Sequence, residues 1–214
     1  MNAIETNKIK IWLFTKEQYV ELLSEEEKCY LKHFNQSRAR QYSYSRTSLR
    51  KALSSLFKIN PLKVPIFAPP GRQPILKSDL GFISISHCKD ALLIGWSISP
   101  IGIDIENSNR VIKSNKIFRK ILNDSELKEI SPKNEKDNIR RLLKKWVIKE
   151  AIVKKEAQSL ITNAKDWEWR LQERIAYNKK QNKKTIVVQD NILGWEIGLA
   201  CDELKNKTPI ICLD

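Results

Sequence analysis

Three acidic side chains, two in a short predicted strand and one on a predicted helix, have types and spacing that could bind a cation. In the run Gly102-Ile103-Asp104-Ile105-Glu106, a β-strand would send Asp104 and Glu106 to the same face, because successive side chains of a strand point to opposite faces. Two neighbouring carboxylates repel each other unless a cation lies between them, and oxygen ligands favour a hard ion such as Mg²⁺. The run therefore predicts a magnesium site. The alternative is a half-exposed strand whose acidic residues face water.

The third carboxylate, Glu150, continues the apolar face of a predicted helix. That face is formed by Ile139, Leu142, Leu143, Trp146 and Val147, and its next members are Glu150, Ala151 and Lys154. A buried carboxylate without a partner is costly, so Glu150 requires a metal ion, a lysine or a hydrogen-bond network. The alternative is that the face reaches the surface there and that Glu150 pairs with Lys154 one turn later.

Candidate phosphate ligands lie in the first half of the chain. Ser86 ends a predicted strand and His87 follows it, at a position where side chains often contact ligands. A histidine can donate a hydrogen bond to a phosphate, although a single histidine is more often structural. Four arginines on predicted helices could bind phosphate through their planar guanidinium groups, or could form a solvated basic face; they are Arg38, Arg40, Arg46 and Arg50.

The composition favours an anionic partner but does not identify it. The chain has 214 residues, a formal charge of +14 and a pI near 9.6, so it attracts phosphates and acidic surfaces. Nucleic acid, an acidic protein and a phosphorylated small molecule all remain open at this point. The four cysteines form no CxxC pair, and there is no long apolar run, which predicts a cytoplasmic protein with no membrane span.

The secondary-structure elements that must position these residues form a block of helices, then a block of strands, and then both again. Residues 24–58 predict two helices, and a proline-rich connection follows, ending in Gly71-Arg72-Gln73-Pro74. Residues 82–86, 92–98 and 101–106 predict adjacent strands of one small sheet. Residues 110–157 then predict helices, and the strands predicted after them are 167–174, 185–189 and 194–202 with a hairpin tip at 177–184.

The order of helices then strands, given twice, predicts an α+β protein of two similar lobes. Residues 1–100 are expected to form the N-terminal lobe and residues 101–214 the C-terminal lobe. Residues 85–99 and 189–203 share an apolar pattern around an Ile/Leu-Gly-Trp core, which is a faint sign of duplication.

Taken in order, four motifs resemble the 4'-phosphopantetheinyl transferase superfamily, and in particular its monomeric class that activates surfactin synthetase. They are the loop of residues 71–74, Ile85-Ser86-His87, the run of residues 102–106, and Trp146-Val147-Ile148-Lys149-Glu150-Ala151 with Lys154. The loop departs from the usual Gly-Lys-Pro or Gly-Arg-Pro, because Gln73 stands between Arg72 and Pro74. Either Arg72 or Gln73 then occupies the contacting position.

The resemblance implies a reaction and a role for each residue. Members of this superfamily transfer phosphopantetheine from coenzyme A to a serine of an acyl or peptidyl carrier protein. By resemblance, Asp104, Glu106 and Glu150 hold Mg²⁺, and Asp104, Glu150 and Lys154 take part in catalysis, with Glu150 or a water molecule on the metal accepting the serine proton. The implied coenzyme A contacts are Arg46, Arg72, Gln73, Ser86, His87, Lys149 and Lys154.

The resemblance also implies a fold and partners. It predicts a pseudo-dimer of two lobes in one monomeric chain, an active site between them, and an acidic helical carrier protein as partner, with no role for nucleic acid or a membrane. Two alternative hypotheses for the function are another magnesium-dependent phosphate enzyme and a basic nucleic-acid-binding module. The sequence contains no GxxxxGK[ST] loop or RNA-binding aromatic strands that would favour either.

Overall fold

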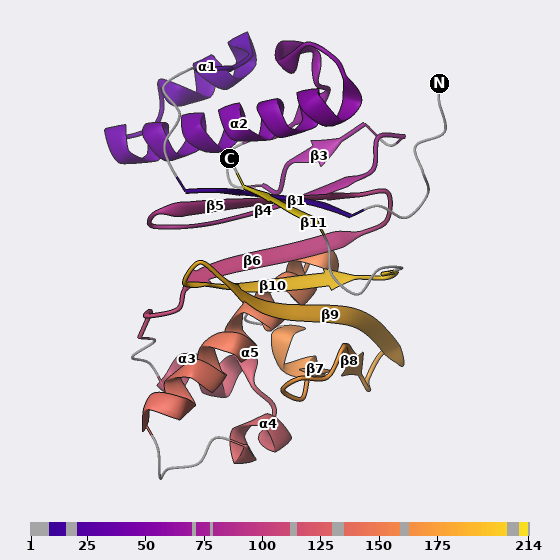
Figure 1. Cartoon of the computed structure of the whole chain (residues 1–214). Coiled ribbons are helices and arrows are strands. Elements are labelled where there is room, and N and C mark those ends of the chain that lie inside the picture. Colours follow the sequence, from indigo (N-terminus) through magenta and orange to yellow (C-terminus); the bar gives the residue numbers. More distant parts are fainter. Residues whose placement is uncertain are drawn as a thin grey trace.

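The computed structural model shows a mixed helix and sheet protein in which two sheets are flanked by helices (Figure 1). It describes residues 9–15, 21–69, 72–77, 79–111, 115–129, 135–158, 163–204 and 210–213. The predicted α+β class is confirmed. Among these residues, no helix is both long and apolar enough to span a membrane.

The first sheet combines the two ends of the chain. Its spatial order is β11 (Ile210–Leu213), β1 (Lys10–Phe14), β5 (Ala91–Ser97) and β4 (Phe82–Cys88). β11 is parallel to β1, whereas β1 with β5 and β5 with β4 are antiparallel. The C-terminal strand therefore completes the sheet that the N-terminal strand begins.

The second sheet contains the carboxylate strand. Its spatial order is β6 (Ile101–Asn107), β10 (Trp195–Cys201), β9 (Lys183–Ile192), β8 (Ile175–Asn178) and β7 (Trp167–Glu168), and all its pairs are antiparallel. A separate ribbon pairs β2 (Ile66–Phe67) with β3 (Ile75–Leu76).

The helices cover the outer faces of the two sheets. They are α1 (Glu25–Leu31), α2 (Gln36–Phe57), α3 (Asn115–Ile121), α4 (Asp124–Lys128) and α5 (Glu135–Lys155), with short 3-10 turns at Pro61–Lys63 and Ala164–Asp166. Ser24 begins α1 with a capping box, and Asn35 caps α2 by accepting a hydrogen bond from the Arg38 N–H group. These caps explain why the predicted helical region 24–58 divides into two helices.

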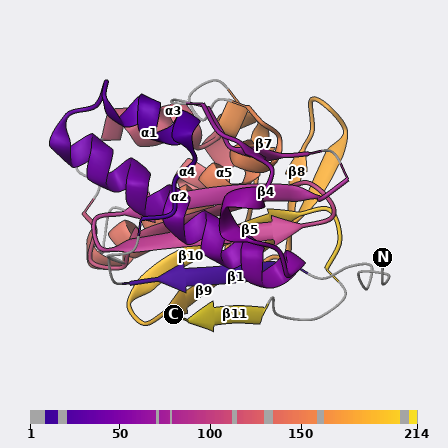
Figure 2. The same ribbon diagram turned by 90° about the horizontal axis from the view of Figure 1, so that it is seen from above.

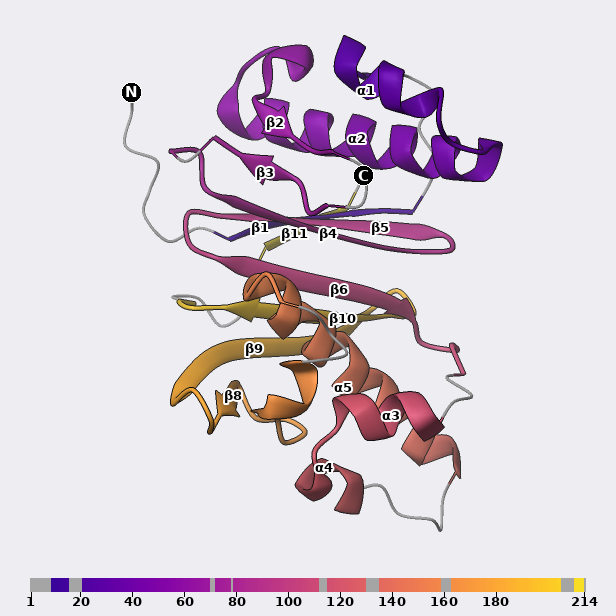
Figure 3. The ribbon, with the colours of Figure 1, turned by 180° about the vertical axis from the view of Figure 1, so that it is seen from behind.

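The layers follow the order helix, sheet, sheet, helix. α2 crosses the outer face of the first sheet, as seen from above in Figure 2, and α5 packs on β6 and β10 on the far side of the second sheet (Figure 3). The inner faces of the sheets enclose one apolar cluster that includes Leu13, Leu93, Ile103 and Leu199, each at most 1% exposed. This sandwich buries the apolar side of β6 and leaves Asp104 and Glu106 on the α5 side.

Several sequence-based predictions of strands were wrong. β1 precedes the helices, and neither β1 nor β11 was predicted, because five and four residues are too short to show a clear alternation. β6 does not join β4 and β5 in one sheet but pairs with β10. Only Trp167–Glu168 of the predicted strand 167–174 is extended, because a turn follows it.

The strand pairing is repeated between the two sheets. In each sheet a first strand lies antiparallel to the second strand of a hairpin: β1 to β5, and β6 to β10. Both hairpins close with two residues, between Cys88 and Ala91 and between Ile192 and Trp195. The Ile/Leu-Gly-Trp cores do not coincide, since Gly95 lies inside β5 while Gly194 lies in the β9–β10 turn with a φ of 84°.

Gly102 allows α5 to approach the carboxylate strand closely. A Cβ atom at this position would overlap the carbonyl oxygen of Ala151 and the backbone nitrogen of Lys155, both of which are rigid parts of the helix. A Cβ at Gly95, by contrast, would meet Cγ2 of Ile103 at 3.0 Å, and that is a side-chain atom with room to adjust. The position of α5 over β6 therefore depends on Gly102.

We expect Gly102→Ala to destabilise the protein by about 3 kcal/mol, near the upper end of overpacking effects, because the helix backbone must move. Urea unfolding followed by circular dichroism measures this change. Gly95→Ala is the matched control and should cost clearly less. Equal losses for the two variants would show that the approach of α5 is not the limiting contact.

Candidate active site

The two sheets meet along the edge strands β4 and β6. The Ser84 hydroxyl accepts a hydrogen bond from the Ile103 N–H group at 3.1 Å, and the Ser86 hydroxyl donates to Oδ1 of Asp104 at 2.6 Å. Both serines lie on the face of β4 that is turned away from α2, since Ile83 and Ile85 fill the opposite face. The strand alternation therefore brings Ser86 of the first sheet to Asp104 of the second.

Asp104 is the centre of this junction. It is only 4% exposed, and Nζ of Lys154 on α5 lies 2.7 Å from its Oδ1 atom, which Ser86 also contacts. Its Oδ2 atom is buried and has no hydrogen-bond partner among the described residues. A buried carboxylate oxygen without a partner is costly, so this atom marks a place where a ligand would be stabilised.

Glu106 lies on the same face of β6 but is turned toward Arg110, with which it forms an ion pair. The Arg110 guanidinium lies 5.6 Å from the ring centroid of Trp146 on α5. Directly opposite Glu106 on β10 is a further carboxylate, Glu196, which accepts hydrogen bonds from the amides of Gln189 and Asn191. Glu106 therefore lies near two other carboxylates, Asp104 and Glu196, and is paired with the guanidinium of Arg110.

Glu150 faces the same junction from α5. Burial and, to a smaller extent, the negative charge of Asp104 together raise the pKa of Glu150 to about 7, although Lys154 and Arg110 oppose the shift. Lys154 does not pair with Glu150, as one alternative proposed, because it reaches across to Asp104. The helical stripe thus brings a carboxylate with an unusually high proton affinity beside Asp104.

A basic cleft of about 260 Å³ opens next to Lys154. Its lining includes Arg38, Arg46, Arg72, Gln73, Pro74 and His87. Arg46 is 6% exposed, it forms no ion pair within the described part of the chain, and its Nε atom has no hydrogen-bond partner there. A buried guanidinium with a free donor in a basic cleft is suited to bind an anion.

The remaining lining residues are positioned by local contacts. The Gln73 amide donates to the carbonyl of Ile83 at 3.2 Å, which fixes the loop against β4, while Arg72 and Pro74 also border the cleft. Gly71 lies outside the described residues. The surrounding protein lowers the pKa of His87 by desolvation, and Lys154 and Arg38 lower it further. His87 also borders a neighbouring pocket of about 810 Å³ with Arg40 and Lys89.

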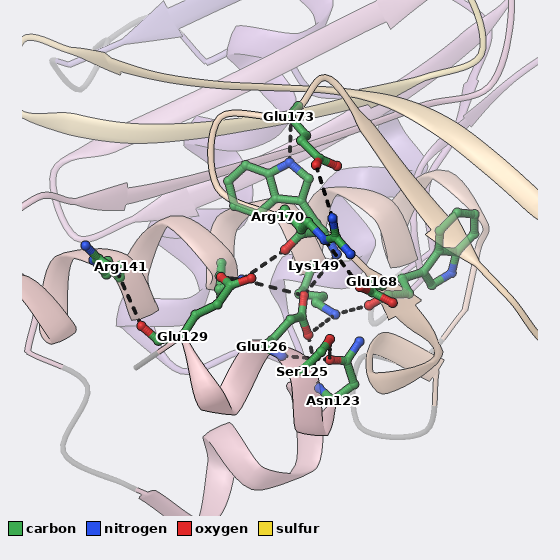
Figure 4. A network of polar contacts seen from close by, with 12 residues as sticks. Asn123, Ser125, Glu126, Glu129, Arg141, Lys149, Glu168, Arg170 and Glu173 are labelled. Atoms are coloured by element: carbon green, nitrogen blue, oxygen red, sulfur yellow. Dashed lines mark hydrogen bonds and ion pairs between the residues drawn. The ribbon is translucent and has the colours of Figure 1, made fainter. Parts of the chain in front are cut away.

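Two predicted basic residues lie away from the cleft. The Lys149 ammonium is fully buried on the other side of α5, 2.7 Å from Glu126 and in contact with the carbonyls of Ala164 and Trp167 (Figure 4). Arg50 is likewise buried, 2.9 Å from Glu27. The structure therefore does not bring Lys149 to the other predicted coenzyme A contacts, because consecutive helix residues point about 100° apart.

Sequence reasoning missed three residues that belong to this region. Tyr42 lies one turn before Arg46, and its ring is 4.9 Å from the Arg46 guanidinium. Arg110 and Glu196 both lie beside Glu106. The spacing of Tyr42 and Arg46 on one helix face was a usable signal. Glu196 could not be found without the β6–β10 register.

The predicted metal ligands are near one another but are not assembled into a cluster. Within the described ranges, no three acidic, histidine or cysteine residues converge as they would around an ion. The physical reason is that Arg110 holds Glu106 and Lys154 holds Asp104. The donor chemistry still fits a hard cation, since the unpartnered Oδ2 of Asp104 and the Glu150 carboxylate are oxygen ligands.

Carboxylates beside a cleft lined by arginine, histidine and lysine are suited to bind an anionic, phosphate-bearing ligand. Comparison with known proteins agrees: residues 100–200 match the family model described as the 4'-phosphopantetheinyl transferase superfamily. The match covers slightly less than half of the chain, and it agrees with the resemblance carried by the motifs at residues 102–106 and 146–154. The matched segment contains Asp104, Glu106, Glu150 and Lys154.

Two curated relatives extend the comparison. A holo-[acyl-carrier-protein] synthase of Mycoplasma mycoides subsp. mycoides SC is 28% identical over 110 residues, and one of Mycoplasma capricolum subsp. capricolum is 26% identical over 110 residues. In both cases the aligned stretch covers 51% of this chain and 99% of the relative. Nearly the whole of each relative thus corresponds to about half of this protein.

Proposed function

We propose that this protein transfers the 4'-phosphopantetheine group of coenzyme A to a serine of an acyl or peptidyl carrier protein. The transfer converts the apo carrier to its holo form and releases 3',5'-adenosine bisphosphate. The observation that carries this proposal is the junction of Ser86, Asp104 and Lys154 beside a basic cleft. The superfamily match and the two named relatives support the same activity.

The cleft residues provide the phosphate contacts of coenzyme A in this proposal. Arg46 offers a buried guanidinium with an unused donor, and Arg38 and Arg72 add exposed positive charge to the same cleft. His87 lines this cleft with Lys154 and Arg38 and donates to a phosphate, most strongly when it is protonated. Gln73 borders the same cleft but already donates to Ile83, so Arg72 is the better candidate for the loop contact.

We assign the cation site to Asp104, Glu106 and Glu150, with Mg²⁺ as the ion. Bound there, Mg²⁺ would supply positive charge to the pyrophosphate of coenzyme A, where negative charge increases in the transition state. Lys154, which borders the cleft and is 25% exposed, adds charge from the protein itself.

The chemistry requires a base for the attacking serine. The carrier hydroxyl attacks the phosphorus nearer the pantetheine, the bond to the leaving nucleotide phosphate breaks, and the hydroxyl proton must leave. Glu150 is suited to accept this proton, because a pKa of about 7 places its ionised and protonated forms in balance near neutral pH. Ser86 and Lys154 hold Asp104 in place beside it.

The two-lobed organisation is part of the same proposal. The repeated strand pairing supports an N-terminal lobe of residues 1–100 and a C-terminal lobe of residues 101–214 that form a pseudo-dimer, in which β11 of the second lobe crosses over to pair with β1 of the first. The site then lies between the lobes, with Ser86 and Arg46 from one and Asp104 and Glu150 from the other. Since one chain supplies both halves, we propose a monomer of the surfactin-synthetase-activating class.

The formal charge of +14 suits an acidic carrier domain as partner, through long-range steering. We place the reaction in the cytoplasm, where the described cysteines Cys29, Cys88 and Cys201 would stay as the free thiols seen here.

The proposal is tested by incubating the full chain with an apo carrier protein, coenzyme A and Mg²⁺, and measuring the carrier mass. We expect a gain of one phosphopantetheine group that is lost with EDTA and lost in Asp104→Ala, because that variant removes the centre of the junction. Glu25→Gln, a change at an exposed residue of α1, is the matched control and should load the carrier normally.

Two outcomes would count against the proposal. If the folded protein binds coenzyme A but loads no fatty acid, polyketide or peptide carrier, another phosphate reaction at the same carboxylates becomes the better assignment. If it does not bind coenzyme A at all, the assignment of the cleft is wrong.

A further inference from the structure

The immediate surroundings of Glu106 contain more negative charge than the predicted cation site alone requires. Asp104 lies two residues away on the same strand face, and Glu196 lies directly opposite on β10 and is only 5% exposed. Carboxylates directly opposite each other in a sheet repel, with side chains about 5 Å apart. The pair of Glu106 and Glu196 therefore needs compensation in any state of the protein.

The two glutamates are compensated in different ways. Glu196 receives neutral donors: Nε2 of Gln189 at 2.6 Å and Nδ2 of Asn191 at 3.0 Å. Glu106 receives a full positive charge from Arg110, four residues later on the same segment. Neutral amides do not cancel a negative charge, so the Arg110 guanidinium is the cationic group that offsets the repulsion between Glu106 and Glu196.

The Arg110 side chain can separate from Glu106 and pair with it again without movement of the backbone. This side chain is 42% exposed, and its guanidinium, while paired with Glu106, also lies over the face of Trp146, a contact that can hold Arg110 when the ion pair opens. The backbone beneath it is fixed, because Ser108 donates from its N–H group to the Gly194 carbonyl at 2.9 Å, and Asn191 donates to the Ser108 hydroxyl. Movement can thus be confined to the side chain.

We propose that Arg110 is an exchangeable counter-ion that competes with the divalent cation for Glu106. Without the cation, Arg110 pairs with Glu106; when a cation binds to Asp104, Glu106 and Glu150, Glu106 would turn toward the cation and Arg110 would leave Glu106 while keeping its contact with Trp146. This inference rests on the cation site of the proposed function but not on carrier loading. It makes Arg110 a positioning residue that weakens cation binding and offsets the repulsion between Glu106 and Glu196.

Binding of Mn²⁺ to the full chain without coenzyme A tests the competition, measured by electron paramagnetic resonance. We expect Arg110→Gln to bind Mn²⁺ about two- to fivefold more tightly than the native protein, the range that one partly exposed ion pair supports. Arg119→Gln, at an exposed arginine of α3, removes the same charge and should change affinity by less than about 1.5-fold. Equal unfolding midpoints confirm that the variants are folded.

A second experiment measures how accessible the Arg110 guanidinium is. Its modification by phenylglyoxal, quantified by peptide mass spectrometry, should become faster when Mn²⁺ saturates the native protein, because the guanidinium is released from Glu106. Unchanged or weaker Mn²⁺ binding by Arg110→Gln, relative to Arg119→Gln, would overturn the inference while leaving the proposed function intact. Absence of Mn²⁺ binding in both the native protein and Arg110→Gln would overturn the inference and the cation site together.

Discussion

Glu150→Gln should reduce the rate of carrier loading by about 10²–10⁴-fold, the range for loss of a general base. The amide cannot accept the serine proton, and it is a weaker cation ligand than a carboxylate. The rate is measured by carrier mass at saturating Mg²⁺ and coenzyme A. A loss of less than about threefold would exclude Glu150 as base and as ligand.

The same variant should become more stable than the native protein at high pH. The pKa of Glu150 is raised from 4.5 to about 7, so the stability associated with its protonated form is present below pH 4.5 and is lost as the pH rises through 7. At 1.36 kcal/mol per pH unit, Glu150→Gln should gain up to roughly 3 kcal/mol at pH 8 in EDTA and little at pH 4.

Glu156→Gln, in the turn that follows α5, should change stability at high pH in the opposite direction. Burial alone would raise the pKa of Glu156, but Lys155 and Lys183 lower it below its usual value. Its replacement should therefore cost stability at pH 8 rather than add it. If both variants shift stability in the same direction, the pH dependence does not come from desolvation of Glu150.

The carboxylate site was predictable because its signals are local. The alternation of residues 102–106 in a strand fixes the common face of Asp104 and Glu106, and helical spacing places Glu150 on the stripe of Trp146. Both patterns depend only on backbone periodicity, which is the strongest information in a single sequence.

The partners of these carboxylates were not predictable in the same way. That Ser86 and Lys154 share one oxygen of Asp104 depends on where two sheets meet, and β6 was expected in the wrong sheet. Likewise Glu196 is placed by strand register alone. Contacts between residues far apart in sequence are set by packing, which no local pattern contains.

Lys149 shows most clearly what a motif alone cannot predict. Its place in the motif suggested a coenzyme A contact, but its ammonium is buried in an ion pair with Glu126. Lys149 and Glu126 are each fully buried and lie 2.7 Å apart. Burial lowers the pKa of Lys149 and the charge of Glu126 opposes that shift. Glu126 also accepts from the backbone N–H groups of Trp169 and Asn123, so it joins α4, α5 and the segment before β8 (Figure 4).

Lys149→Met should therefore destabilise the protein by about 3 kcal/mol, the lower end of the range for breaking a buried ion pair, since Glu126 loses its nearest partner and keeps Lys145 at 3.9 Å. Lys144→Met, on the more exposed side of α5, should remain within about 0.5 kcal/mol of the native protein in urea unfolding. The KM for coenzyme A distinguishes this structural role of Lys149 from a role in substrate binding. At temperatures where Lys149→Met is folded, its KM for coenzyme A should equal the native value, whereas a raised KM with unchanged stability would return Lys149 to the coenzyme A site.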